Sequence, residues 1–300
     1  MATPQASAFQ PAPAATARRK WSGPVAYVLI APPILIMTLL IFFPAIQALF
    51  ETLFVTSGTT GKAAVSLQNY IAFFQSPILV ANLIFTLEIT LGTVLLLFVV
   101  GLPIALYLRF SKSRIAAGVQ MLALFPLFVP GVILAFALIR FTGTHGMLDT
   151  LLHLIGIHGY STPYLHPQGV VIALVWENIP FTVLVLTAGL RQVEDSVIES
   201  ARDVGADQWQ IFTRIIAPLI TRAVVIVFCL NVIGVFGSFT LPYLLGPAQP
   251  MMMGVSMQQT FNNYLDRTGA LTQAVITFIF CASVGLLYVR TVTRPKQEAV

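Results

Sequence analysis

Six long apolar stretches, separated by polar links, set the pattern of this 300-residue sequence. They lie near residues 25–49, 81–108, 115–140, 168–190, 218–241 and 270–290. A helix crosses the hydrocarbon core of a bilayer with ~20 apolar residues, so each stretch is long enough to span it. The first four contain proline, which membrane helices tolerate where neighbouring groups satisfy the freed backbone. The pattern predicts an all-α membrane protein with six transmembrane helices, several of them kinked.

Composition supports this interpretation and argues against a soluble or nucleic-acid-binding protein. Hydrophobic residues make up 57% of the chain and charged residues 9%, whereas soluble domains carry roughly 25% charged residues. The formal net charge is +5, but no aromatic-interleaved basic patch accompanies it. We therefore expect a lipid bilayer around the chain and no nucleic acid as a partner.

The basic residues are divided unequally between the two sides of the predicted membrane. Thirteen Lys and Arg residues fall in the N-terminal segment, the second-to-third link, the fourth-to-fifth link and the C-terminal segment. The opposite side has only Lys62, Arg140 and Arg267. Because basic loops remain in the cytoplasm, both termini are expected to be cytoplasmic. Residues 1–20 and 291–300 are expected to form cytoplasmic tails, the first of them disordered.

The link between the fourth and fifth stretches, residues 191–222, carries internal structure signals. Ser196 and Glu199 fit the S-x-x-E capping box, so a short helix is expected to start there. Gly205 fits the end of such a helix, because glycine accepts the left-handed conformation. Asp207 can then cap a second helix. The link is expected to fold into two short helices joined by a turn.

On the second short helix, Trp209, Phe212, Ile215 and Ile216 recur at helical spacing and are expected to form one apolar face. Two interpretations of such a segment remain open on spacing alone. It could be a docking element for a protein partner, or an amphipathic segment that lies on lipid headgroups.

Seven residues of this link share the spacing of one family motif: Glu199, Ser200, Ala201, Gly205, Ile215, Ala217 and Pro218. The arrangement closely resembles the EAA motif, which marks the permease subunits of binding-protein-dependent ABC importers. Ser200 and Ala217 depart from the motif's alanine and leucine, but both are small and the glycine and proline remain. In the fourth stretch, the segment from Trp176 to Phe181 is similar to the family's Trp-x-x-x-Pro-Phe stretch. The resemblance covers roughly residues 80–290.

The resemblance implies that this link forms coupling helices, which sit in a groove on an ATP-binding subunit and carry its closing motion into the membrane. Glu199 would anchor the joint by charge-assisted bonds. Gly205 would permit the turn, while Trp209 and Phe212 would pack in or beside the groove. The residues expected to take part in ATPase coupling are Glu199, Ser200, Ala201, Asp203, Gly205, Ala206, Trp209, Phe212, Ile215 and Pro218.

The resemblance also implies the organisation and the partners of the chain. Residues 21–80 would hold the first transmembrane helix and an external loop, and residues 81–290 the permease domain. The expected partners are a cytoplasmic ATP-binding subunit, a second permease subunit (a copy of this chain or a sister chain) and an extracytoplasmic solute-binding protein. The expected location is the bacterial cytoplasmic (inner) membrane.

The chain itself is not expected to be an enzyme or to carry a cofactor. The segment from Ser57 to Ala63 superficially suggests a phosphate loop, but Thr56 stands where the first glycine is required. Ala63 stands where a Ser or Thr must hold magnesium. ATP hydrolysis is therefore assigned to the partner subunit.

Polar residues inside the apolar stretches are candidates for the transport path. Ionisable groups in a membrane are costly and often functional, which singles out Glu88 and Glu177. Asn231, Ser238 and Thr240 could also line a path. The alternative for these three is hydrogen bonding between helices.

All four histidines, His145, His153, His158 and His166, fall in one external link. Their spacing matches no standard metal site, so solvated loop residues and no metal are expected. The two cysteines, Cys229 and Cys281, lie in apolar stretches and are expected to be buried thiols.

The sequence gives less information about the substrate than about the fold or the family. The segments 239–246, 251–254 and 258–261 are similar to the corresponding region of spermidine/putrescine permeases, although Pro247 stands where a second glycine is usual. A polyamine-like substrate is one expectation. The alternatives are an ABC permease for sugar, phosphonate, iron or another small solute, or a secondary transporter that needs no ATPase.

Overall fold

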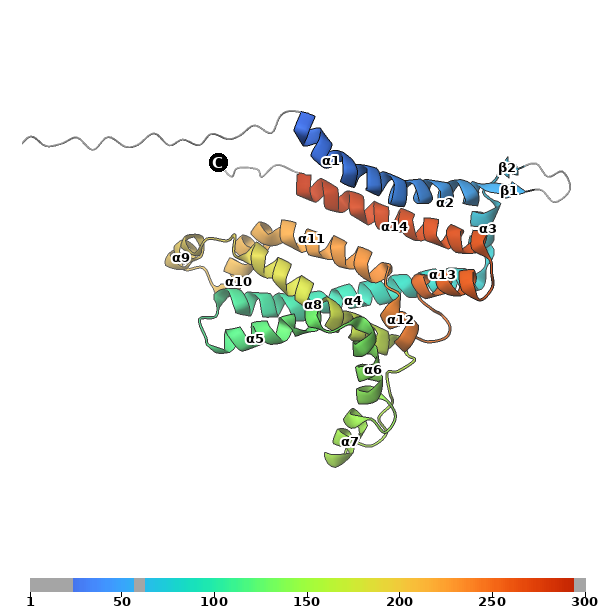
Figure 1. Ribbon diagram of the computed structural model, residues 1–300. Coiled ribbons are helices and arrows are strands. Elements are labelled where there is room, and N and C mark those ends of the chain that lie inside the picture. Colours follow the sequence, from blue (N-terminus) through green and yellow to red (C-terminus); the bar gives the residue numbers. More distant parts are fainter. Residues whose placement is uncertain (1–23, 57–62, 294–300) are drawn as a thin grey trace, which may run out of the picture. The chain divides into compact units, whose positions relative to one another are not determined.

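The computed structural model describes residues 24–56 and 63–293 and divides into two compact units, Met1–Ala48 and Leu49–Val300 (Figure 1). In the first unit, α1 (Pro24–Met37) continues through the π-helical turn η1 (Thr38–Phe42) into α2 (Phe43–Leu53), whose last residues belong to the second unit. Tyr27–Leu53 forms one apolar helix that is long enough to cross a membrane. The first predicted span is therefore confirmed.

Four long helices form the body of the second unit (Figure 1). They are α4 (Pro77–Phe110), α8 (Pro167–Leu190), α11 (Ala217–Phe236) and α14 (Arg267–Thr293). The most extensive contact between helices joins α4 to α8, and α11 packs against α4, α8 and α14. Each of the four is long and apolar enough to span a membrane. Together with Tyr27–Leu53 and Gly131–Leu154, they give six candidate spans among the described residues, which is the number predicted.

Shorter elements join the long helices at the two ends of this unit. We call these the α9 end and the α13 end, after the helices that lie there (Figure 1). The shorter elements are β1 (Phe54–Thr56), β2 (Ala63–Val65), α3 (Gln68–Gln75), α5 (Ile115–Leu124), the 3₁₀ turn η2 (Phe125–Phe128), α6 (Gly131–Thr142), α7 (Met147–Leu154), α9 (Asp195–Asp203), α10 (Gln208–Ile211), the π-helical turn η3 (Phe212–Ile216), α12 (Thr240–Leu245) and α13 (Met253–Asn262).

The fold is all-α apart from one small antiparallel ladder. β1 and β2 pair with Phe54 opposite Val65. Three expectations of the sequence fall wholly or largely outside the described residues: the tail 1–20, the last residues of the tail 291–300, and most of the segment that superficially suggests a phosphate loop.

The third predicted span, 115–140, is not one helix. α5 and η2 end at Phe128, and α6 begins at Gly131 and turns away from the long helices (Figure 1). Val129 has an extended backbone, with φ −104° and ψ 115°, because the ring of the following Pro130 disfavours the helical conformation there. Pro130 also lacks the N–H that a continuous helix requires. The apolar run 115–140 is therefore divided between two helices. The candidate span on this part of the chain is Gly131–Leu154.

The fifth span is displaced toward the N-terminus relative to the predicted 218–241. It runs without a break from Gln208 to Phe236, because the π turn η3 joins α10 to α11. Pro218 follows this turn as the second residue of α11. A widened turn is one way to accommodate a proline that has no N–H for the preceding carbonyls. The helix stops before Gly237, and Thr240 begins the separate helix α12.

Close approach of the long helices depends on small residues. A Cβ atom on Gly101 of α4 would lie 2.8 Å from Thr182 Cγ2 of α8. A Cβ atom on Gly189 of α8 would lie 2.4 Å from Ala223 Cβ of α11. Contacts of this kind, which let backbones pack closely, are typical of helix association in membranes.

We expect Gly189→Ala to lower the stability of the α8–α11 contact. The added methyl has no room, and overpacking of this kind costs about 1–3 kcal/mol. The matched control is Gly234→Ala on α11, where nothing lies within 4 Å of the added Cβ. Equilibrium unfolding of both purified variants in detergent measures the difference, and equal midpoints for the two would contradict the close packing.

Candidate functional site

The α9–α10 segment, residues 191–211, projects from one end of the long helices (Figure 1). α9 begins at Asp195 with Glu194 as its N-cap residue. Ser196 lies inside the helix, and its hydroxyl donates to Glu194 Oε2 at 3.2 Å. The capping box predicted from Ser196 and Glu199 is therefore wrong, although the predicted helix exists, with its N-cap two residues earlier.

Gly205 ends α9 in the left-handed conformation, with a φ of +83°. The N–H of Ala206 donates to the carbonyl of Ala201 at 3.0 Å, and the N–H of Gly205 donates to that of Arg202 at 2.9 Å. These two bonds form the Schellman motif that closes many helices. A residue with a Cβ atom pays roughly 1–2 kcal/mol in this conformation, so the predicted role of the glycine in the turn is confirmed.

Asp207 caps the second short helix, as predicted. Its Oδ1 accepts from the N–H of Gln210 at 2.7 Å, and Gln210 Oε1 accepts from the N–H of Asp207 at 3.3 Å. The reciprocal pair is a complete capping box at the start of α10. Two consecutive turn devices, one at Gly205 and one at Asp207, thus fix the angle between α9 and α10.

The underside of the segment is packed into the long helices. Ile198, Ala201, Ile211 and Ile216 are buried in one cluster with residues of α4, α8 and α11. The members from these three helices are Ala105, Leu186, Leu190, Ile220 and Val227. The segment is therefore a rigid extension of three spans rather than a loose loop.

The outward side of the segment is charged, with a few large apolar side chains. Glu199, Ser200 and Asp203 are exposed. Val204 is 84% exposed and Trp209 71% exposed. These five residues form the outward face of the segment, and none of them enters the buried cluster beneath it.

The apolar face predicted for the second helix is divided by the π turn. Ile216 is buried, Phe212 and Ile215 are half-buried, and Trp209 is exposed. The widened turn over Phe212–Ile216 shifts the helical phase after Ile211, so positions that a regular helix would align face different surroundings. The rings of Trp209 and Phe212 still lie side by side, with centroids 6.2 Å apart.

A clasp at Arg109, which the sequence analysis did not single out, ties the end of α4 to this segment. Its Nη2 donates to Asp195 Oδ1 at 2.6 Å and to the carbonyl of Val193 at 2.9 Å. Its Nε donates to the carbonyl of Leu190 at 3.2 Å. The guanidinium also lies over the Phe110 ring, 5.1 Å from the centroid. Only its place in a basic link hinted at a role, because its hydrogen-bond partners are 81 or more residues away.

The five candidates for the transport path do not gather at one point. Glu88 on α4 and Glu177 on α8 are exposed within the single chain, and Glu177 Oε1 lies 3.1 Å from the Cβ position of Gly131. Asn231 is buried and donates to Thr182 Oγ1 at 2.9 Å, which links α11 to α8. Ser238 is half-buried and Thr240 exposed, at the break between α11 and α12.

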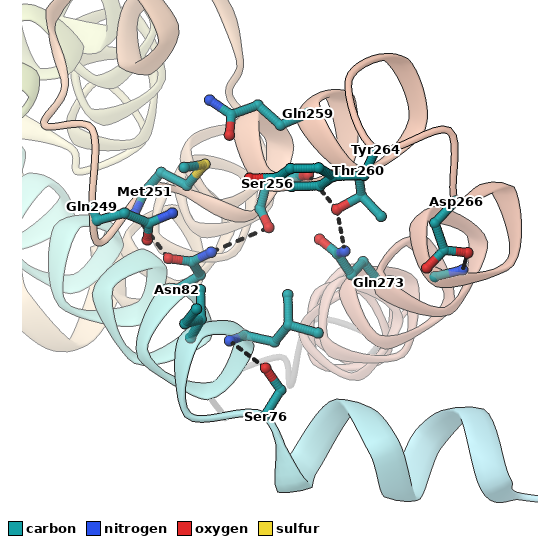
Figure 2. Close-up of a pocket in the computed structure, with 13 residues that line it drawn as sticks. Ser76, Asn82, Gln249, Met251, Ser256, Gln259, Thr260, Tyr264, Asp266 and Gln273 are labelled. Carbon is teal, nitrogen blue, oxygen red and sulfur yellow. Dashed lines mark hydrogen bonds between the residues drawn. The ribbon is translucent and has the colours of Figure 1, made fainter.

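Two pockets lie toward the α13 end of the second unit. One, of about 890 Å³, is bordered by α6, the turn before α7, and α8, and it includes Arg140, His145 and Trp176 in its lining. The other, of about 420 Å³, is bordered by α4, α13 and α14 (Figure 2). The path candidates do not belong to the lining of either pocket.

Three of the four histidines gather around Asp149, a buried residue of α7. His153 Nε2 lies 3.4 Å and His145 Nδ1 3.8 Å from its carboxylate, and His153 and His158 face each other with their Nδ1 atoms 2.7 Å apart. Burial, and then the charge of Asp149, raise the pKa of Tyr160 in the following loop. Among the described residues, no group of three or more His, Cys, Asp or Glu side chains is arranged to hold a metal ion.

Comparison with known proteins identifies the family. The model of the family described as “Binding-protein-dependent transport system inner membrane component” matches residues 97–296, which include the α9–α10 segment. The chain belongs to this family. The resemblance to permease subunits of ABC importers is thereby confirmed.

Among curated relatives, the permease is similar to proteins of several named transport systems. The spermidine/putrescine transport system permease protein PotB of Salmonella typhi is 28% identical over 249 residues, covering 81% of this chain and 85% of the relative. The sulfoquinovosyl glycerol transport system permease protein SmoG of Agrobacterium fabrum is 25% identical over 280 residues, covering 89% of this chain and 90% of the relative.

Solved structures support the fold of the permease. A chain of a bacterial alginate ABC transporter, in complex with an alginate pentasaccharide-bound periplasmic protein, superposes with a TM-score of 0.76 at 19% identity, covering 92% of this chain and 96% of that one. A chain of the inward-facing MetNI methionine ABC transporter gives 0.56 at 21% identity, covering 72% and 97%. These likenesses show that the permease has the transmembrane fold of ABC transporters.

We expect Arg109→Ala to loosen the α9–α10 segment while the long helices remain folded. The substitution removes a charge-assisted bond and two bonds to backbone carbonyls, worth about 1–2 kcal/mol here because Asp195 is largely exposed. Hydrogen exchange of amides 190–206 should become about 5–30 times faster. Arg191→Ala, which removes a nearby exposed guanidinium, is the control, and equal exchange in the two variants would contradict the clasp.

Proposed function

We propose that the α9–α10 segment is the joint through which a separate ATP-binding subunit drives this ABC importer permease. The observation that carries the proposal is the two-sided character of the segment. Its underside is locked into α4, α8 and α11, and its outward face presents Glu199, Val204 and Trp209. One side is thus suited to hold the membrane helices and the other to bind a soluble partner.

This arrangement favours docking over a segment that lies on lipid headgroups. A headgroup-bound helix directs its apolar face to the acyl chains and its charges to water. In α9 the apolar residues Ile198 and Ala201 already face the protein interior, and the outward side carries Glu199 and Asp203. An exposed tryptophan such as Trp209 is the type of anchor that protein interfaces favour.

Movement of α9 would be transmitted directly into the spans. Protein interiors are as densely packed as organic crystals, so a displaced helix carries its buried neighbours with it. Ile198 shares its cluster with Ala105 of α4, Leu190 of α8 and Ile220 of α11. The Arg109 clasp adds a polar connection between α4 and the start of α9. We propose that closure of the ATP-binding subunit tilts these three helices together.

In this proposal the α9 end faces the cytoplasm. Eight of the ten described basic residues lie on segments at that end: Arg109, Lys112, Arg114, Arg191, Arg202, Arg214, Arg222 and Arg290. Arg140 and Arg267 lie at the α13 end. The positive-inside rule gives the same orientation as the proposed coupling role. A second permease subunit would complete the path, and a solute-binding protein would deliver solute at the α13 end.

For the substrate, we propose a polyamine-like cation. Relatives of spermidine/putrescine systems support it, and so do the exposed carboxylates of Glu88 and Glu177, which suit a cation electrostatically. The relatives of sulfoquinovosyl glycerol and molybdenum systems represent the second candidate, another small solute. Titration of the cognate solute-binding protein with putrescine, spermidine, sugars and oxyanions separates the two.

We expect Glu199→Ala and Gly205→Val to weaken assembly with the ATP-binding subunit. Loss of a charge-assisted bond costs about 1.5–3 kcal/mol, or roughly a 10–100-fold weaker complex. The valine strains the left-handed turn and misplaces α10. Copurification and ATPase activity stimulated by the solute-binding protein measure both effects.

The control for this test is Glu194→Gln, which changes an exposed carboxylate of the same segment outside the motif. It should assemble as the wild type does. Full assembly and coupling of both motif variants would show that the joint lies elsewhere. Solute flux in liposomes from this chain without any ATPase would instead indicate a secondary transporter.

We expect Glu88→Gln to lower putrescine uptake in proteoliposomes at least several-fold while assembly with the ATP-binding subunit persists. The carboxylate is a rare charge on a membrane helix, and neutralisation removes its attraction for a cation. Glu88→Asp should recover part of the uptake because it retains the charge. Wild-type uptake by Glu88→Gln would remove this residue from the path.

A further inference from the structure

The pocket of about 420 Å³ at the α13 end has a distinctive balance of hydrogen-bonding groups (Figure 2). Its walls come from the start of α4, the segment before α13, α13 itself and the start of α14. All of these belong to one compact unit of the chain. The pocket is remote from the α9–α10 segment, at the opposite ends of the long helices (Figure 1).

The two amides deepest in this pocket are held by hydrogen bonds within the protein. Asn82 Nδ2 donates to Ser256 Oγ at 3.2 Å, and Asn82 Oδ1 accepts from the N–H of Met251 at 2.9 Å. Gln273 Nε2 donates to Thr260 Oγ1 at 2.8 Å, and that hydroxyl donates onward to the carbonyl of Ser256 at 2.8 Å. The orientation of both amides is therefore fixed by the protein.

One acceptor in the same network is left without a donor. Gln273 is 1% exposed, and its Oε1 has no hydrogen-bond partner among the described residues. Figure 2 shows this oxygen directed from α14 toward the space beside Asn82. A buried acceptor without a donor is unfavourable, so a ligand that donates a hydrogen bond would be stabilised at this oxygen.

The charged side chains of the pocket also favour a ligand that donates hydrogen bonds and is positively charged. Asp266 is the one carboxylate among its lining residues, and no Lys, Arg or His is among the described residues of that lining. Asp266 Oδ1 accepts from the N–H of Gly269 at 2.8 Å. The neighbouring Arg267 forms an ion pair with Glu51 at 3.1 Å, and no ion pair involves Asp266 among the described residues. The formal charge of the lining is thus negative.

We propose that this pocket binds the primary ammonium group of an alkylamine. An ammonium has three N–H donors and no acceptor, which matches an open carboxylate oxygen and an unpartnered amide oxygen. Tyr264 borders the same pocket and offers an aromatic face to a cation. Ile78, Leu79 and Met251 supply apolar wall for the methylene chain.

This inference rests on the proposed function only for the source of the amine. A polyamine on its way through the importer is one source, and the headgroup of phosphatidylethanolamine in the surrounding bilayer is the other. Both present the same primary ammonium. The experiment therefore uses a soluble diamine and a lipid of defined headgroup as separate probes.

The test is binding of putrescine to the assembled transporter in nanodiscs of phosphatidylglycerol, measured by calorimetry without the solute-binding protein. We expect saturable binding that 1,4-butanediol and N-permethylated putrescine do not displace, because the first lacks charge and the second lacks donors for two acceptors. Asp266→Asn should weaken binding about tenfold, and Gln273→Leu at least as much. Glu194→Gln, which neutralises an exposed carboxylate at the α9 end, should bind as the wild type does.

The lipid arm repeats the measurement in nanodiscs that contain phosphatidylethanolamine, with native mass spectrometry of the retained lipid. Retention of that lipid by the wild type but not by Asp266→Asn, together with loss of putrescine binding, assigns the headgroup as occupant. Displacement by the diol, unchanged affinity of Asp266→Asn, or binding of neither probe would overturn the proposal. Because the same preparations report assembly with the ATP-binding subunit, failure of the pocket is distinguishable from failure of the importer assignment.

Discussion

Burial of the underside of the α9–α10 segment is the constraint on which the working of this permease depends. Apolar side chains of α4, α8 and α11 pack against this underside and bury Ile198, Ala201 and Ile211. Without this packing, the segment would be a flexible link, and in the proposed mechanism an ATP-binding subunit would move it without moving the membrane helices. In that mechanism the buried area at this junction serves transmission of force as well as stability.

The features of this segment that could be predicted from the sequence are those that depend on residues close together in the chain. Gly205 and Asp207 act on backbone atoms within five residues, so their roles were visible in the sequence, and both turn devices form as predicted. The helix start was misplaced because Glu194 and Ser196 satisfy each other instead of the predicted box. The long apolar spans were equally evident, since length and composition suffice to identify them.

Features that depend on distant partners escaped the sequence analysis. In the sequence, Arg109 is one more basic residue near a link. Only the fold places the carbonyls of Leu190, at the end of α8, and of Val193, just after it, within reach of its guanidinium. Sequence periodicity assumes a regular helix. The π turn after Ile211 breaks that regularity, so Ile216 is buried while Trp209 is exposed. The break at Val129 illustrates a local signal that apolar composition obscured, because Pro130 was visible but the run around it remained long enough to span.

The two ends of the second unit are built by different interactions, and this difference suits an importer. At the α9 end, apolar packing makes a stiff joint. At the α13 end, Asn82 and Thr86 of α4 accept from the backbone N–H groups of Met251 and Met253, at 2.9 and 2.8 Å, and so satisfy donors of the segment that leads into α13 and of its first turn. Gln273 of α14 donates to Thr260 at the same end and keeps one acceptor unused. In the proposed mechanism, motion is transmitted at one end and solute is met at the other, and the two kinds of construction suit these two tasks.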